Sequence, residues 1–265
     1  MGSNQPKVSV IICTKNSEEF IDRSIVSVLN QHYDNIELIV VDNYSTDTTR
    51  TRVINLVDKL LIYGPERTAQ ANYGISRATG EIIYLTGSDM TRDYNFIKEG
   101  VKKLQQGYDA IYTSVKTDKD VKHFWGKVKA LERECYIGTP KESARFFKKS
   151  VWEDLGKFDE NLIAFEEDFQ HRLDKYGYYT TRIKSREYHL HEDDTLKKIF
   201  IKSYYYGKSQ RAYINKHKHR AISKITRINL KKFLSHPILL VGFVIYRIVQ
   251  YTGGIGGYLS ESFTH

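Results

Sequence analysis

The chain has 265 residues, of which 40% are hydrophobic and 28% are charged. This composition excludes a disordered chain, and two cysteines exclude both a disulfide scaffold and a multi-cysteine zinc site. The formal net charge is +9, yet it is unevenly spread: residues 195–260 hold 13 Lys and Arg with no Asp or Glu, whereas residues 1–194 are close to neutral.

The first half of the chain alternates apolar runs with helical patterns. Continuous apolar runs predict buried strands at residues 7–13, 36–41, 59–63, 81–85 and 108–113. Apolar stripes at helical spacing predict helices between them, at residues 18–31, 47–56 and 68–78. This alternation predicts an α/β fold with a mostly parallel sheet and helices on both faces.

The second half is less regular and ends in a basic region. Helices are expected at residues 121–136, 166–176 and 195–216. The apolar run Pro237–Tyr246 is too short for a membrane span, which needs ~20 residues. A longer segment would bury Arg247 and include the glycines of 253–257. We expect an interfacial segment on an anionic membrane; packing against the rest of the chain or a partner, and a solvated basic face, are the alternatives.

Polar residues follow three of the predicted strands. Thr14 and Asn16 come after the first strand, Asp42 after the second, and Ser88 with Asp89 after the fourth. In open parallel sheets, ligands bind beyond the carboxyl ends of the strands. A single Asp in such a place is often only a helix cap. Two of them with Thr14 and Asn16 predict a site for a polar ligand.

Several ordered segments carry a family resemblance. The opening strand reads VSVIICTKN (Val8–Asn16), and SVLNQ (Ser27–Gln31) and ELIVVDNYSTD (Glu37–Asp47) follow it. The next segments are ANYG with ATGE at residues 71–81, then GKFDE (Gly156–Glu160) with EED at residues 166–168. Together they span about residues 7–180 and resemble glycosyltransferase family 2, the inverting nucleotide-sugar transferases of GT-A fold.

The resemblance implies a domain plan. Residues 1–194 would form the GT-A catalytic domain, Rossmann-like, with a nucleotide-binding half at about 7–115 and an acceptor half at about 116–194. Beyond the resemblance, the basic charge and the apolar run predict that residues 195–265 form a basic, partly apolar helical region associated with the membrane surface.

The resemblance also implies roles for single residues. Thr14, Asn16, Asp42, Asn72 and Ser88 would contact the nucleotide. Asp89 would be the final Asp of the DxD-type motif, which binds Mn²⁺ or Mg²⁺ on the donor diphosphate. The first Asp of that motif is replaced here by Gly87, so the chain departs from the family pattern at a ribose or sugar contact.

Two further roles follow from the resemblance. Asp168 would be the general base that takes the proton of the acceptor hydroxyl, with the adjacent Glu167 as the alternative. A histidine near 190 can complete the metal site in similar proteins. The sequence offers His189 and His191, which share one face of a strand, and His191 is favoured.

These observations predict a metal-dependent hexosyltransferase at the cytoplasmic face of the membrane, bound peripherally. The donor would be a UDP- or GDP-linked sugar, and the acceptor a glycan or phosphate on a polyprenyl lipid. A transferase with a soluble polysaccharide or protein acceptor is the enzymatic alternative. A non-catalytic family member and a nucleic-acid-binding protein are the others, although no nucleic acid is expected because the aromatic residues form no known binding module.

Overall fold

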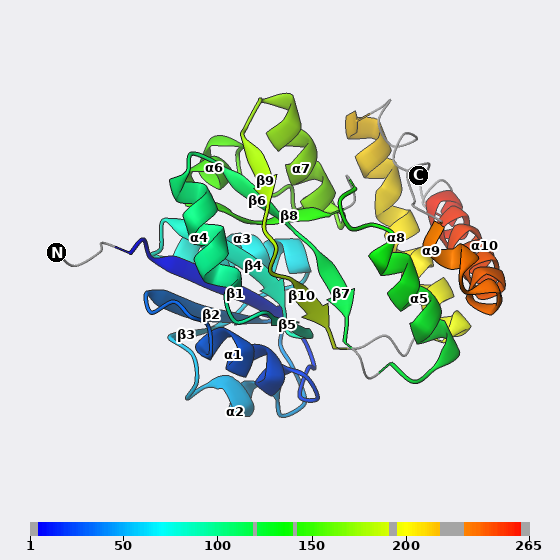
Figure 1. The fold of residues 1–265 in the computed structure, drawn as a ribbon, viewed down its shortest axis with the longest axis horizontal. Coiled ribbons are helices and arrows are strands. Elements are labelled where there is room, and N and C mark those ends of the chain that lie inside the picture. Colours follow the sequence, from blue (N-terminus) through cyan, green and yellow to red (C-terminus); the bar gives the residue numbers. More distant parts are fainter. Residues whose placement is uncertain (1–4, 119–120, 140–141, 191–194, 218–230, 261–265) are drawn as a thin grey trace. The chain divides into compact units, whose positions relative to one another are not determined.

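The structure, a computed structural model, describes residues 5–118, 121–139, 142–190, 195–217 and 231–260. Two compact units make up the chain (Figure 1). The first, called the sheet unit, consists of Met1–Ser114, Ser143–Glu160 and Phe165–Leu190. The second, called the helical unit, consists of Val115–Glu142, Asn161–Ala164 and His191–His265. Residues 115–142 thus group with the C-terminal region, whereas the predicted boundary lay at residue 194.

The sheet unit is built on seven strands in the order β3-β2-β1-β4-β8-β6-β9. Their bounds are β1 (Val8–Thr14), β2 (Ile36–Asp42), β3 (Lys59–Ile62), β4 (Ile82–Gly87), β6 (Ala110–Thr113), β8 (Ser143–Lys148) and β9 (Thr180–Arg182). All neighbouring strands are parallel except at β8, which runs antiparallel to β4 and β6. Two short strands, β5 (Met90–Arg92) and β10 (Glu187–His189), form an antiparallel pair. The predicted α/β fold is confirmed.

Helices cover both faces of this sheet (Figure 1). One face carries α1 (Ile21–Leu29), α2 (Thr49–Val53) and α4 (Phe96–Gln105), and the other carries α3 (Arg67–Arg77), α6 (Lys149–Asp154) and α7 (Phe165–Lys175). Alternate residues of one strand pack into the two hydrophobic cores on opposite faces of the sheet. Ile11 packs on the face covered by α3, α6 and α7, and Ile12 packs on the face covered by α1, α2 and α4. This double burial is why the strands read as continuous apolar runs.

Gly74 sets how closely α3 approaches the sheet. A Cβ added there would lie 2.7 Å from Ile11 Cγ2 and 2.8 Å from Val41 Cγ2, closer than carbon atoms pack. The glycine therefore lets α3 lie directly on β1 and β2, and it orients the first turn of α3 toward the ends of those strands.

The helical unit contains β7 (Val115–Thr117), α5 (Phe124–Glu134), α8 (Leu196–His217), α9 (Lys231–Leu234) and α10 (Pro237–Ser260). Its core joins α5, α8, α9 and α10 through Val128, Ile199, Phe233 and Phe243. The helices α8 and α10 pack along one another at glycines. A Cβ on Gly257 would lie 1.9 Å from the Tyr204 carbonyl oxygen, so only glycine permits this crossing.

The helix α10 is longer than the sequence predicted. It runs through all 24 residues from Pro237 to Ser260, and the glycines of 253–257 do not end it because they pack against α8. Among the described residues, α10 is the one helix that is long and apolar enough to cross a bilayer, judged by length and composition alone. Its most apolar 18 residues have a mean hydropathy of 1.6, and 22% of them are buried.

Candidate active site

The ends of β1 and β2 bring two predicted nucleotide contacts side by side. Thr14 is paired with Asp42 in the parallel register. The Gln70 side chain of α3 donates hydrogen bonds to the backbone oxygens of Thr14 (3.0 Å) and Val41 (2.6 Å), which holds the two strand ends together. Both Thr14 and Asp42 are buried.

Each of these two residues has an unpaired buried oxygen. Asp42 Oδ2 accepts a hydrogen bond from the Ser45 backbone N–H at 2.8 Å. Within the described part of the chain, Asp42 Oδ1 and Thr14 Oγ1 have no partner. Leaving a buried polar atom unpaired costs about 1–3 kcal/mol. Two such atoms on adjacent strand ends indicate a place where a polar ligand completes the hydrogen bonding.

The loops after β1, β2 and β4 are tied to one another. Asn16, in the left-handed region at φ 47°, accepts a hydrogen bond from the Thr46 N–H at 2.8 Å. Ser88 donates to Ser17 Oγ at 2.8 Å. Asn16 and Ser88 therefore contribute to the rigidity of the strand-end edge, whether or not they also contact a nucleotide.

Asn72 is not brought to this edge by its contacts. Its side-chain N–H groups donate to the Phe158 carbonyl oxygen (2.9 Å) and to Glu160 (2.8 Å). Its oxygen accepts from Trp152 Nε1 (3.3 Å) and from the Phe158 N–H (3.1 Å). The amide links α3 to the segment after α6, which explains its burial without a ligand.

The carboxylate of Asp89 follows β4 and meets a histidine of β10. His189 Nε2 lies 3.1 Å from Asp89 Oδ2. Burial by itself would raise the pKa of Asp89, but the hydrogen bond and charge of His189, with the charge of Arg67, outweigh it and lower the pKa. Asp89 is thus held as an anion. The favoured His191 lies outside the described residues; the structure pairs Asp89 with the other candidate, His189.

A carboxylate oxygen beside an imidazole nitrogen is a donor set that suits Mn²⁺ and is compatible with Mg²⁺. No group of three such ligands occurs among the residues that the structure describes. The Asp89–His189 pair therefore fits a metal whose remaining ligands come from a bound diphosphate.

Gly87 makes room for the Asp89 carboxylate. A Cβ at position 87 would lie 2.7 Å from Asp89 Oδ1. The residue that departs from the family pattern thus sits where any side chain would press on the candidate metal ligand.

The three acids that begin α7 have different surroundings. Asp168, the predicted base, is fully buried, and Arg172 Nε donates to its Oδ2 at 2.8 Å. Glu167 is exposed. Glu166 forms ion pairs with Arg67 at 3.0 Å and Arg145 at 3.2 Å.

Glu166 belongs to a buried charge cluster that sequence reasoning missed. Burial would raise its pKa, but Arg145 and Arg67 lower it to about 2. Arg145 also lies 3.8 Å from Glu187 of β10. Because Arg67 lowers the pKa of Asp89 as well, the cluster reaches the strand-end site electrostatically. The signal in the sequence was Arg145, a charge beside the apolar residues Phe146 and Phe147.

Comparison with known proteins agrees with this geometry. The model of glycosyl transferase family 2 matches residues 9–156, more than half of the chain. The chain therefore belongs to that family, and the protein is a glycosyltransferase.

Two curated relatives carry informative names. One is the GalNAc(5)-diNAcBac-PP-undecaprenol beta-1,3-glucosyltransferase of Campylobacter jejuni, 26% identical over 228 residues, which cover 78% of this chain and 70% of that protein. Another is the UDP-Glc:alpha-D-GlcNAc-diphosphoundecaprenol beta-1,3-glucosyltransferase WfgD of Escherichia coli, 39% identical over 87 residues, covering 31% of this chain and 34% of that protein.

Solved structures share the fold. A Pyrobaculum calidifontis mannosyltransferase in complex with GDP-Man and Mn²⁺ matches with TM-score 0.65 and 18% identity, over 98% of this chain and 88% of its own. Residues 1–349 of Staphylococcus aureus TarS, in complex with UDP-GlcNAc, match with TM-score 0.53 and 15% identity, over 97% of this chain and 90% of that one. At these identities the likeness shows the GT-A fold alone.

Proposed function

We propose that the protein transfers a hexose, with inversion, from a UDP- or GDP-linked donor to a glycan on a polyprenyl-phosphate lipid at the cytoplasmic membrane face. The observation that carries the donor half is the pair of unpaired buried oxygens, Thr14 Oγ1 and Asp42 Oδ1, at adjacent strand ends. They would hydrogen-bond the base and ribose, with Asn16 and Ser88 shaping the loops around them.

Asp89 and a histidine, His189 or His191, would hold Mn²⁺ or Mg²⁺. The metal would neutralise the charge that the diphosphate gains as it leaves. Arg67 is the cation best placed to assist, because its side chain is 42% exposed and its charge acts on Asp89. The chain itself supplies an anionic ligand, a fixed strand-end edge and a partly exposed cation.

The acceptor oxygen would attack the anomeric carbon as the bond to the diphosphate oxygen breaks, and its proton would pass to a carboxylate at the start of α7. The sequence predicted Asp168 for this role. Asp168 is fully buried beside Arg172, whereas the Glu166 side chain is 17% exposed and shares Arg67 with Asp89, which favours Glu166. If the donor diphosphate draws Arg67 away, Glu166 becomes a stronger base, as general-base catalysis requires.

The lipid-linked acceptor is supported by the names of the two relatives, both of which act on undecaprenol-linked substrates. It is also supported by an exposed apolar row on α10, formed by Ile238, Val241, Ile248 and Ile255, and by the sequence of residues 195–260, which contains 13 Lys and Arg and no Asp or Glu. Such a surface suits an anionic bilayer.

Interfacial docking is favoured over a span by the partner of α10. The helix α8 packs along α10 and carries six Lys and Arg in its sequence. A spanning α10 would draw α8 into the hydrocarbon, at roughly 2.5–3.5 kcal/mol for each central charge.

The deciding experiment is a thermal-shift panel of UDP, GDP, CDP and dTDP, each with Mn²⁺ and with EDTA, on the wild type and on Asp89→Asn. A ligand at 100 times its Kd adds about 2.7 kcal/mol to the unfolding free energy. We expect a metal-dependent shift with UDP or GDP that Asp89→Asn removes. No shift with any nucleotide would overturn the proposal and leave a non-catalytic family member.

The base is assigned by comparing Glu166→Gln with Asp168→Asn, with Glu167→Gln as the control. We expect Glu166→Gln to lower kcat by about 10²–10⁴-fold with an unchanged nucleotide shift. Asp168→Asn should chiefly lower stability, because it leaves Arg172 buried without its anion. Loss of kcat in a stably folded Asp168→Asn variant would instead restore Asp168 as the base.

A further inference from the structure

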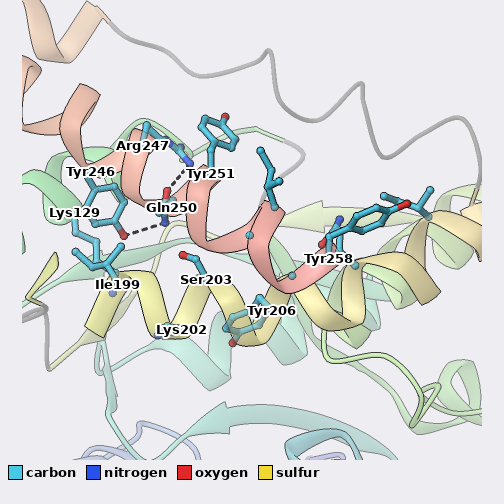
Figure 2. A pocket seen from close by; sticks show the side chains of 15 residues that line it. Lys129, Ile199, Lys202, Ser203, Tyr206, Tyr246, Arg247, Gln250, Tyr251 and Tyr258 are labelled. Carbon is cyan, nitrogen blue, oxygen red and sulfur yellow. Dashed lines mark hydrogen bonds between the residues drawn. The ribbon is translucent and has the colours of Figure 1, made fainter. Parts of the chain in front are cut away.

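The helical unit contains a pocket of about 590 Å³, and none of its lining residues has a role in the transfer proposed above. It lies between α8 and α10, with Lys129 of α5 at its border (Figure 2). Its floor is formed where Gly207 and Gly254 bring the two helices together. The volume is in the range of small-molecule sites.

The lining is aromatic and apolar, with only basic charges. Four tyrosines and three isoleucines contribute to it, together with Lys129, Lys202 and Arg247, and it contains no Asp or Glu. Arg247 is ion-paired with Glu132 and donates to Gln250 at 2.9 Å, and Gln250 donates to the Tyr246 hydroxyl at 3.2 Å (Figure 2). Since these polar groups bind one another, the wall offers mainly ring and aliphatic surface.

The pocket is continuous with the exposed apolar row of α10. Ile255 belongs to both, and its neighbour in the lining, Tyr251, is also exposed. A hydrocarbon chain in a bilayer against that row would reach the pocket without crossing water. Because most of the lining surface is apolar, the pocket suits a hydrocarbon chain better than a sugar or nucleotide.

We propose that this pocket binds the hydrocarbon chain of a polyprenyl phosphate, with the phosphate toward the basic border. The choice of a polyprenyl chain rests on the proposed function and on the relatives named for undecaprenol-linked substrates. A phospholipid has the same general chemistry, apolar chains joined to a phosphate headgroup, so the test separates the two sources.

Two glycines of α10 provide a matched pair of variants. Gly254 lines the pocket, and the nearest atom to an added Cβ is 3.9 Å away, so the Cβ of Gly254→Leu meets no clash and the leucine side chain is expected to occupy pocket space. Gly256 does not line it, and an added Cβ would make ordinary contacts of 3.5 Å with the Tyr204 ring. Both changes raise helix propensity equally, so Gly256→Leu is the control.

The binding test is equilibrium dialysis of the full chain against farnesyl phosphate, dodecyl phosphate and inorganic phosphate. We expect farnesyl phosphate to bind the wild type and Gly256→Leu alike, and Gly254→Leu at least tenfold more weakly. Equal affinity for dodecyl phosphate would overturn the polyprenyl assignment in favour of phospholipid. Binding of inorganic phosphate as tight as that of farnesyl phosphate, or unchanged binding to Gly254→Leu, would overturn the pocket as the chain site.

A second measurement uses the unaltered protein. A farnesyl phosphate carrying a benzophenone should crosslink to peptides of α8 and α10; labelling confined to the sheet unit would contradict the proposal. The nucleotide thermal shift separates the two hypotheses. Farnesyl phosphate binding without any nucleotide shift would refute the transferase proposal alone, whereas turnover with a lipid-linked acceptor that Gly254→Leu leaves unchanged would refute the pocket alone.

Discussion

Two buried threonines on neighbouring strands provide a direct test of the nucleotide site. Thr14 Oγ1 has no partner in the described structure, whereas Thr86 Oγ1 donates to Glu187 at 3.2 Å. We expect Thr14→Val to keep the unfolding free energy of the unliganded protein and to weaken nucleotide binding by about 1 kcal/mol, or roughly fivefold. Thr86→Val should lower stability by about 1–3 kcal/mol. Calorimetry and nucleotide titration of both variants measure this.

The reverse pattern, with Thr14→Val destabilising and binding unchanged, would show that Thr14 has a purely structural role. It would also remove the observation on which the donor half of the proposal rests.

Restoring the family's acidic residue at position 87 should not improve the enzyme. The Cβ of Gly87→Asp would lie 2.7 Å from Asp89 Oδ1, and the second carboxylate would add like-charge repulsion. We expect kcat to fall at least tenfold, with Mn²⁺-dependent nucleotide binding weakened, while the unfolding midpoint stays close to that of the wild type. A gain in activity would mean that Asp89 turns away from the strand end when donor binds.

For single residues, the sequence predicted which ones lie at the strand ends but not which side chains form ion pairs near them. Thr14, Asp42 and Asp89 follow apolar runs, so their place at one edge of a parallel sheet could be anticipated. The ion pairs of Glu166 with Arg67 and Arg145 join residues 99 and 21 positions apart. Nothing in local sequence specifies such pairs. The family motif points to Asp168 as the base, and the kcat comparison of Glu166→Gln with Asp168→Asn tests that prediction.

Among the elements, the five predicted strands of the first half are confirmed, because burial on both faces leaves an unmistakable apolar run. The antiparallel β8 (Ser143–Lys148), inserted between β4 and β6, was not predicted. Its order in the sheet depends on long-range pairing, and Arg145 interrupts its apolar pattern. The full length of α10 was missed because glycines read as breaks unless a second helix packs on them.

Where α8 and α10 pack on one another, the effect of replacing a glycine on stability should depend strongly on which glycine is replaced. In Gly257→Val the Cβ would lie 1.9 Å from the Tyr204 carbonyl oxygen, a backbone atom that cannot move alone. We expect a loss of about 1–3 kcal/mol or more from overpacking, seen as faster amide hydrogen exchange in α8 and α10. The control Gly256→Val, with Cβ contacts of 3.5 Å, should exchange like the wild type. If the amide hydrogens of α8 and α10 exchanged equally slowly in both variants, the helices would not pack at Gly257.

For the whole molecule, two buried carboxylates predict sensitivity to acid. Burial would raise the pKa of Glu37, but hydrogen bonds from Lys59, Ser9 and Thr79 lower it from 4.5 to about 2; Glu166 also falls to about 2. Because both folded-state values lie below the unfolded ones, their stabilisation is complete above about pH 5 and is lost as pH falls toward 2.

The variant Glu37→Gln tests this loss of stability at low pH. It should cost about 1–3 kcal/mol at pH 7 and flatten the decline in unfolding free energy between pH 5 and 2. Denaturant titrations across that range measure the effect. A parallel decline in wild type and variant would show that Glu37 is not ion-paired in solution.

The proposed membrane docking would depend on the entire chain, since the near-neutral residues 1–194 are followed by a strongly basic C-terminal region. We expect sedimentation with vesicles that contain anionic lipid, weakening as salt screens the roughly 1 kcal/mol that each nearby Lys or Arg contributes. Val241→Glu with Ile248→Glu, both on the exposed row of α10, should lower binding at least tenfold, because apolar insertion is lost.

The matched control for docking is Ile54→Glu, an equally exposed isoleucine of the sheet unit, which should sediment like the wild type. Alkaline carbonate separates docking from spanning: a peripheral protein is released, whereas a spanning helix stays with the lipid. Retention in carbonate would require α10 to leave its packing on α8, since the basic side chains of α8 cannot follow it into hydrocarbon at acceptable energy. The Glu132–Arg247 ion pair would then be broken too, so an Arg247→Met variant would insert more readily than the wild type; under interfacial docking it would bind vesicles no better.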